Sequence, residues 1–137
     1  MQRPTPPIHP PAPPAHEDDD KSVHDVHGAM LLHEAAAVLN LHAQAVAVQN
    51  IRSLVPVVLD VAAGNYTRWR EQFLLVLGKF SLQDHVLLDD PPATYPDWAR
   101  MDCVVRSWIY GTISNDLVET VMTPDASAHT VWAAVES

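Results

Sequence analysis

The sequence predicts an all-α protein, in which an array of short helices follows one long alanine-rich helix and a disordered proline-rich tail. Two observations lead to this fold class. From about residue 65 onward, apolar residues recur at intervals of three and four positions, the spacing of a buried helix face. No pair of segments shows the alternating pattern expected of paired strands. At 137 residues, with 47% hydrophobic content, we expect one modest domain.

The first 21 residues are predicted to form a disordered, partly polyproline-II tail, because prolines and acids cannot bury enough apolar surface to offset the entropy of ordering. Strings such as Pro4-Thr5-Pro6-Pro7 have the PxxP form bound by SH3-like grooves, which makes such a domain a candidate partner. The same strings are frequent in any proline-rich tail. The prolines and acids concerned are Pro4, Pro6, Pro7, Pro10, Pro11, Pro13, Pro14, Glu17, Asp18, Asp19 and Asp20.

Residues 22–50 are predicted to form one long helix, with Ser22 as its N-cap. Its predicted inner side is formed mainly by small or β-branched residues, which suits packing on a partner or on the main domain; marginal order in isolation is the alternative. The residues on that side are Val23, Val26, Met30, Ala37, Leu41, Ala45 and Val48.

Residues 51–137 carry the predicted core. Pro56 and the valines around it favour an extended segment that leads to a turn at Ala63-Gly64-Asn65. Asn65 is the predicted N-cap of a helix, and a short helical turn is predicted within the loop 81–96, around Leu82, Val86 and Leu87. The buried stripe of the helix after Asn65 is Trp69, Phe73, Val76, Leu77 and Phe80.

Three more helices follow, with predicted caps at Asp97 and Ser114 and a break at Thr123-Pro124-Asp125. The first is expected to end near Gly111. Their predicted inward residues are Trp98, Met101, Val104, Val105, Trp108 and Ile109, then Leu117, Val118, Val121 and Met122, then Val131, Trp132 and Val135.

The composition argues against nucleic-acid binding, because the net charge is -9 and only 8 residues are Lys or Arg. Arg52, Arg68, Arg70 and Lys79 gather around the helix after Asn65, either as a small basic face or as a solvated helix flank. Cys103 is the only cysteine, so an internal disulfide and a Cys-rich zinc knuckle are excluded. With neither a signal peptide nor a long apolar run, we expect a cytoplasmic protein without membrane contact.

The sequence holds no recognisable catalytic motif, and we predict no catalytic, cofactor-binding or metal-binding residues and no enzymatic activity. His24, His27 and His33 lie near one another on the predicted long helix, but no HExxH motif or Cys pair supports a metal site, so a solvated helix face is the preferred interpretation. Cys103 is read as a small buried apolar residue. The carboxylates Asp89-Asp90 and Asp97 belong to a loop that is expected to be solvated.

A string of motifs from about residue 54 to 137 resembles the gag polypeptide of plant copia-type LTR retrotransposons. The order of the motifs is more specific than any one of them. They are Leu59-Asp60-Val61-Ala62-Ala63-Gly64-Asn65-Tyr66-Thr67-Arg68-Trp69-Arg70, Phe73-Leu74-Leu75-Val76-Leu77-Gly78-Lys79-Phe80, Asp84-His85-Val86, Asp97-Trp98-Ala99-Arg100-Met101-Asp102, Ser107-Trp108-Ile109-Tyr110-Gly111-Thr112-Ile113-Ser114, Val121-Met122-Thr123-Pro124-Asp125-Ala126 and Val131-Trp132.

The resemblance implies a capsid-like structural protein that self-associates into virus-like particles packaging the element's RNA. In that family further helices follow, often with a zinc knuckle that contacts RNA, so residues 51–137 look like the N-terminal part of the domain and any RNA contact would need regions beyond them. If partners of the last helix are missing, part of the stripe around Trp132 should be exposed. The alternatives are a host adaptor acting through residues 1–50, and a nonfunctional relic.

Overall fold

The computed structural model describes residues 3–4, 15–89 and 97–137, with side chains in the first helix described from residue 26 onward. It divides into two compact units, residues 1–37 and residues 38–137. The predicted proline-rich tail up to residue 14 lies outside the described residues, apart from Arg3 and Pro4.

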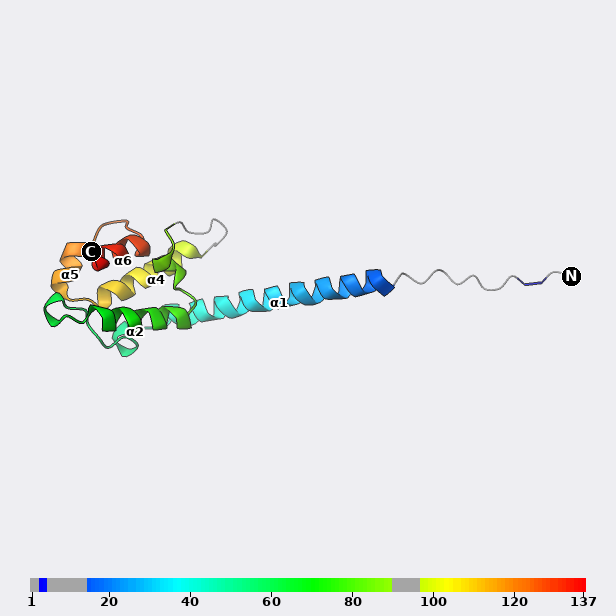
Figure 1. Cartoon of the computed structure of the whole chain (residues 1–137), viewed down its shortest axis with the longest axis horizontal. Helices are drawn as coiled ribbons and strands as arrows, with labels where there is room; N and C mark the ends of the chain where they lie inside the picture. Colours follow the sequence, from blue (N-terminus) through cyan, green and yellow to red (C-terminus); the bar gives the residue numbers. More distant parts are fainter. Residues whose placement is uncertain (1–2, 5–14, 90–96) are drawn as a thin grey trace. The chain divides into compact units, whose positions relative to one another are not determined.

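The described residues confirm the all-α fold class (Figure 1). The α-helices are α1 (Ala15–Val46), α2 (Tyr66–Lys79), α3 (Asp84–Leu87), α4 (Trp98–Gly111), α5 (Asn115–Val121) and α6 (Ala128–Glu136). Two 3-10 turns, η1 (Ile51–Ser53) and η2 (Val61–Ala63), lie between α1 and α2. None of the described helices is both long enough and apolar enough to cross a bilayer.

The bounds of α1 correct two predictions. The helix begins at Ala15, so residues 15–21 are helical rather than part of a disordered tail, and Ser22 lies inside the helix rather than capping it. The physical reason is visible in the sequence: Pro14 is the last proline before Pro56, and the acids Glu17–Asp20 that follow it favour a helix N-terminus through the macrodipole. The helix ends at Val46, a few residues before the predicted end.

The segment before α2 is extended, as predicted, and makes one strand-like contact. Leu59 forms an isolated parallel bridge with Ile113, in which its N–H donates to the Thr112 carbonyl at 2.8 Å and its carbonyl accepts from Ser114 N–H at 2.8 Å. This bridge fixes the chain leading into α2 beside the end of α4. Sequence periodicity could not show it, because a bridge one residue long has no repeat.

Asn65 is the residue before α2, as predicted, but its side chain does not cap the helix. Its amide instead closes the preceding turn: Nδ2 donates to the Val58 carbonyl at 2.9 Å, and Oδ1 accepts from Asp60 N–H at 3.0 Å. Gly64, which lies in this turn just before Asn65, has φ 62°, a left-handed conformation that suits glycine. Asn65 therefore stabilises the turn rather than the helix end.

The core of residues 38–137 is built around aromatic side chains of α2, α4 and α6. Trp69 stacks on Trp132 with ring centroids 5.2 Å apart, and Phe73 lies 5.4 Å from the same indole. Phe80 contacts Trp108 at 5.6 Å. These contacts bring the predicted stripes of three helices into one core, since all five rings are buried.

The remaining helices match their predicted positions, but the cap at Asp97, the burial of Met122 and the exposure of Trp132 differ from the expectations. Ser114 caps α5 as predicted, through a bond from Leu117 N–H to its Oγ at 3.3 Å, whereas Asp97 precedes α4 without a side-chain cap bond. Met122, predicted to point inward, is 52% exposed. Trp132 is only 3% exposed, so the exposure considered for the last helix does not occur.

Candidate functional site

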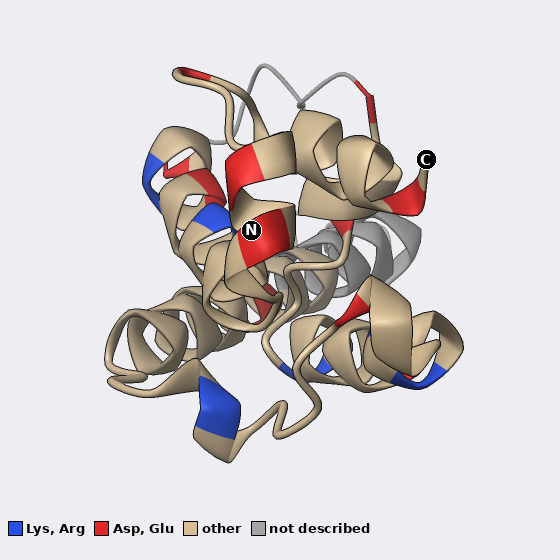
Figure 2. Ribbon diagram, turned by 90° about the vertical axis from the view of Figure 1, so that its left-hand side faces the viewer, with Lys and Arg blue, Asp and Glu red and all other residues tan. Residues whose placement is uncertain are grey.

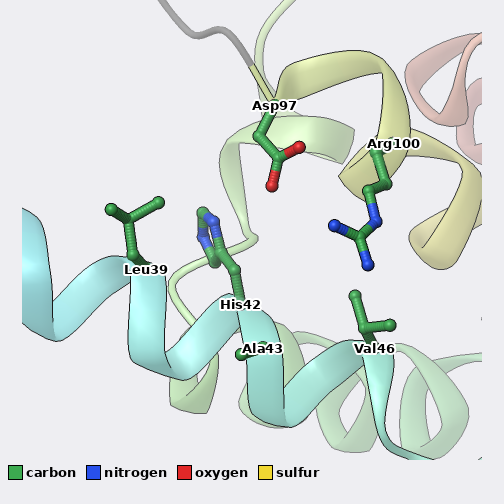
Figure 3. Close-up of a pocket in the computed structure, with 6 residues that line it drawn as sticks. All are labelled: Leu39, His42, Ala43, Val46, Asp97 and Arg100. Atoms are coloured by element: carbon green, nitrogen blue, oxygen red, sulfur yellow. The ribbon is translucent and has the colours of Figure 1, made fainter.

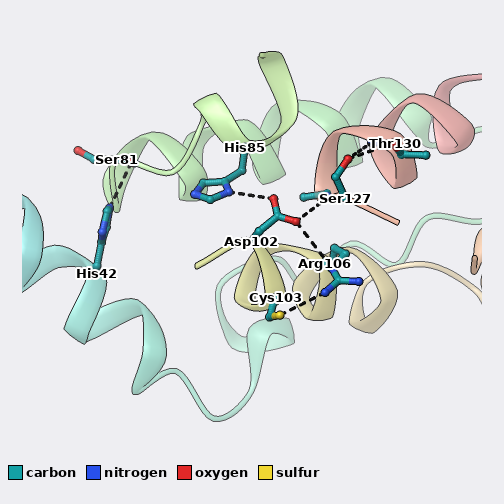
Figure 4. Close-up of polar contacts among 9 residues, drawn as sticks. His42, Ser81, His85, Asp102, Cys103, Arg106, Ser127 and Thr130 are labelled. Atoms are coloured by element: carbon teal, nitrogen blue, oxygen red, sulfur yellow. Dashed lines mark hydrogen bonds and ion pairs between the residues drawn. The ribbon is translucent and has the colours of Figure 1, made fainter. Parts of the chain in front are cut away.

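The main buried polar cluster joins α3, α4 and α6 at the Asp102 carboxylate (Figure 4). Its Oδ1 accepts a hydrogen bond from His85 Nδ1 at 3.0 Å. Its Oδ2 accepts from the backbone N–H of Ala128 at 3.0 Å, in the first turn of α6. Asp102 thus acts as an N-terminal cap for α6 from a different helix, where a carboxylate also complements the helix dipole.

His85 is held on both sides. Its ring stacks on Trp98 with centroids 3.7 Å apart, and the residue is 4% exposed. Asp102, on the side of α4 that also carries Val105 and Ile109, is 8% exposed. The Nδ1 proton is therefore the one that satisfies the carboxylate, which fixes how the imidazole is oriented.

Arg106 lies one turn after Asp102 and completes the cluster on its outer side. Its Nε is 3.8 Å from Asp102 Oδ2, an ion-pair distance too long for a hydrogen bond, and this Nε has no hydrogen-bond partner among the described residues. Its Nη2 donates to Cys103 Sγ at 3.1 Å. Cys103 is exposed, so the prediction of a buried small residue is wrong: it lies on the outer side of α4.

The geometry of this cluster supports a structural role. A His–Asp pair can activate a nucleophile, but the nearby hydroxyls are otherwise engaged: Ser127 Oγ accepts from Thr130 N–H at 3.1 Å and lies 3.0 Å from Thr130 Oγ1. Sequence reasoning missed His85 and Asp102 as a pair. The one available signal was the position of Asp102 next to Met101 on the inward side of the predicted helix.

A second polar and aromatic group lies where α2 meets α6. Arg70 Nε is 3.5 Å from Glu136 Oε1, and its guanidinium lies 6.0 Å from the Trp132 ring centre. Burial, followed by the neighbouring Glu136 carboxylate, raises the pKa of Tyr66, while Arg70 acts in the opposite direction. Arg70 is thus paired with an acid, as expected of a helix flank.

A small open pocket of about 190 Å³ is lined by the end of α1 and the start of α4 (Figure 3). Leu39, Ala43 and Val46 give it an apolar wall, and His42 lies between them with Nε2 3.5 Å from the Ser81 carbonyl. Asp97 and Arg100 extend toward α1 from the opposite side. The pocket therefore combines an apolar wall with one charge of each sign.

The histidines and carboxylates weighed as metal or catalytic groups in the sequence form no such cluster in the described part of the chain. No group of three or more His, Cys, Asp or Glu side chains is placed to hold a metal ion there. His27 and His33 are exposed on α1, and the side chain of His24 is not described. Asp89 lies 3.5 Å from His129, while Asp90 lies outside the described residues.

Charged residues are spread over several helices rather than gathered on one (Figure 2). Arg52 donates from Nε to the Gly111 carbonyl at 2.9 Å, Arg70 pairs with Glu136, and Lys79 Nζ lies 5.7 Å from the Phe80 ring centre, so three of the four residues in the predicted basic group contact other residues of the chain. The reading as a solvated helix flank fits these contacts better than a basic face for phosphate.

Comparisons of the chain with models of protein families, with curated proteins and with solved structures found no match.

Proposed function

We propose that this chain is a non-enzymatic, self-associating structural module of the copia-type gag kind. The observation that carries the proposal is that residues from separate motifs are buried together in one core. Trp69, Phe73, Trp108 and Trp132 come from separate motifs of the resemblance, and all of them are core residues of one helical unit. Motif residues that pack one core are sufficient for a structural scaffold, which needs no reactive site.

The proposal is limited to association between copies. Packaging of RNA is a property of the family as a whole, and a net charge of -9 gives these residues a poor electrostatic basis for binding phosphate. We therefore propose capsid-like self-association for this module and no RNA contact of its own.

An adaptor role is the second candidate, and one observation favours it. The described part of α1 within residues 26–37 is exposed almost throughout, including Met30 at 58% and Leu32 at 74%. A helix that buries so little of its apolar surface is marginal alone and would be stabilised by a partner.

Two observations test the proposal. Light scattering of the purified full chain should show a molar mass that rises with concentration, while an adaptor would stay monomeric until its partner is added. The genomic neighbourhood tests the origin: we expect remnants of protease, integrase and reverse transcriptase downstream, with flanking terminal repeats. An intact host gene without such remnants would contradict the origin.

A further inference from the structure

The pocket between α1 and α4 has an exposed apolar wall whose residues share one helix face. Leu39, Ala43 and Val46 are spaced by four and three positions, so they lie above one another on α1. Leu39 is 60% exposed and Val46 is 40% exposed. Single exposed apolar residues are ordinary on a protein surface, but three that line the same hollow form a site where an apolar side chain can dock.

The charges beside this wall decide what kind of partner fits. Asp97 and Arg100 both line the pocket, and neither forms an ion pair with another described residue. A purely acidic partner would be repelled by Asp97, and a purely basic one by Arg100. A partner that presents an apolar residue together with one acid and one base would satisfy the apolar wall and both charges.

A second copy of this chain presents that set. In a two-fold symmetric interface the same patch meets itself, so residue i of one copy contacts residue j of the other and the reverse. Asp97 of each copy then faces Arg100 of the other, and Leu39 of each copy can enter the other's pocket beside Ala43 and Val46. The patch is self-complementary in charge and in apolar surface.

We propose that Leu39, Ala43, Val46, Asp97 and Arg100 form the contact through which two copies of this chain associate, an inference that rests on the proposed self-association and names its surface. The side chain of Asp97 makes no cap bond to α4, so it can be substituted without removing one.

The test uses charge reversal in the full chain, followed by sedimentation velocity. Arg100→Asp leaves two acids on the patch and Asp97→Arg leaves two bases, so each variant alone should associate about tenfold or more weakly than the wild type. Mixed in equal amounts, the two variants should associate again, because every acid then faces a base of the other variant. Leu39→Glu should abolish association.

Leu75→Glu is the matched control, since Leu75 is 72% exposed on α2 and lies outside the pocket. It should associate like the wild type, and far-UV circular dichroism should show that every variant keeps its helices. If the wild type associates and the charge variants do so equally well, this surface is wrong while the proposed function stands. If the wild type is monomeric at all concentrations, both are wrong.

Discussion

At the scale of single residues, Asp102 does the most to connect separate parts of the fold. One carboxylate accepts hydrogen bonds from His85 on α3 and from Ala128 N–H on α6, and both donors are buried. A buried donor that loses its acceptor costs about 1–3 kcal/mol. Asp102 therefore matters through the two donors that would be left unsatisfied without it.

Asp102→Ala should lower the free energy of unfolding by about 2–4 kcal/mol, because it leaves both donors without a partner. Asp102→Asn keeps one carbonyl acceptor and should lose less. Urea unfolding followed by tryptophan fluorescence measures the difference. Glu71→Gln, at an exposed position on α2, is the control and should change stability little; an Asp102→Ala variant as stable as this control would contradict the role.

Thr112 is the acceptor for the most deeply buried indole. Its Oγ1 accepts from Trp69 Nε1 at 3.0 Å and donates to the Trp108 carbonyl at 2.8 Å. Thr112→Val keeps the shape and removes both bonds, so we expect a loss of about 1–3 kcal/mol. Thermal unfolding against a Thr120→Val control, on the exposed side of α5, would check it. Equal melting temperatures for the two variants would show that the Trp69 bond contributes nothing.

Tyr66 gives a pH prediction. Its folded-state pKa is raised above the ordinary tyrosine value of 10.0, chiefly by burial and then by Glu136. The folded state therefore holds the phenol proton at a pH where the unfolded chain releases it. This contribution is present below pH 10 and is lost as the pH rises through the raised pKa. Tyrosinate absorbance should show one late-titrating group that Tyr66→Phe removes; an unchanged late phase would assign it elsewhere.

At the scale of elements, the positions of the helices can be predicted from the sequence. The hydrogen bonds that cap their N-terminal N–H groups can be predicted only in part. Ser114 caps α5 from its own sequence neighbourhood, as predicted. The first turn of α6 uses Ser127 and also Asp102, a residue 26 positions away. Local patterns can predict the first kind of cap, but the second depends on how α4 and α6 pack, which no periodicity encodes.

The same reasoning explains the α1 and Cys103 errors. The prediction assigned both Pro14 and the acids after it to the disordered tail. Prolines disfavour a helix interior, but acids stabilise a helix N-terminus, so the two kinds of residue should have been treated separately. Cys103 was assigned to the interior by residue type, while its place on α4, one turn before the exposed Ser107, puts it on the outer side. No candidate binding site could be predicted, since the α1–α4 pocket joins segments more than 50 positions apart in the chain.

Ser127 tests the contribution of a local cap to α6. Its Oγ accepts from Thr130 N–H at 3.1 Å, so Ser127→Ala should cost about 0.5–2 kcal/mol. Ser127→Asp keeps an acceptor and should cost less. Chemical denaturation of both variants measures this. If the alanine variant is no less stable than the aspartate variant, then Asp102 alone suffices to cap the helix.

At the scale of the whole molecule, the described helices form a core from the motifs that resemble gag, and α1 leaves apolar residues exposed. Both features fit a scaffold that becomes complete on association. The α1–α4 pocket supplies a surface with matched charges for that step.

Sedimentation equilibrium of the full wild-type chain tests self-association most directly. Across a hundredfold range of concentration, the weight-average molar mass should rise above that of the 15.1 kDa monomer. The rise should be reversible on dilution, as mass action requires. A molar mass that stays at the monomer value up to the highest concentration would contradict the proposed function.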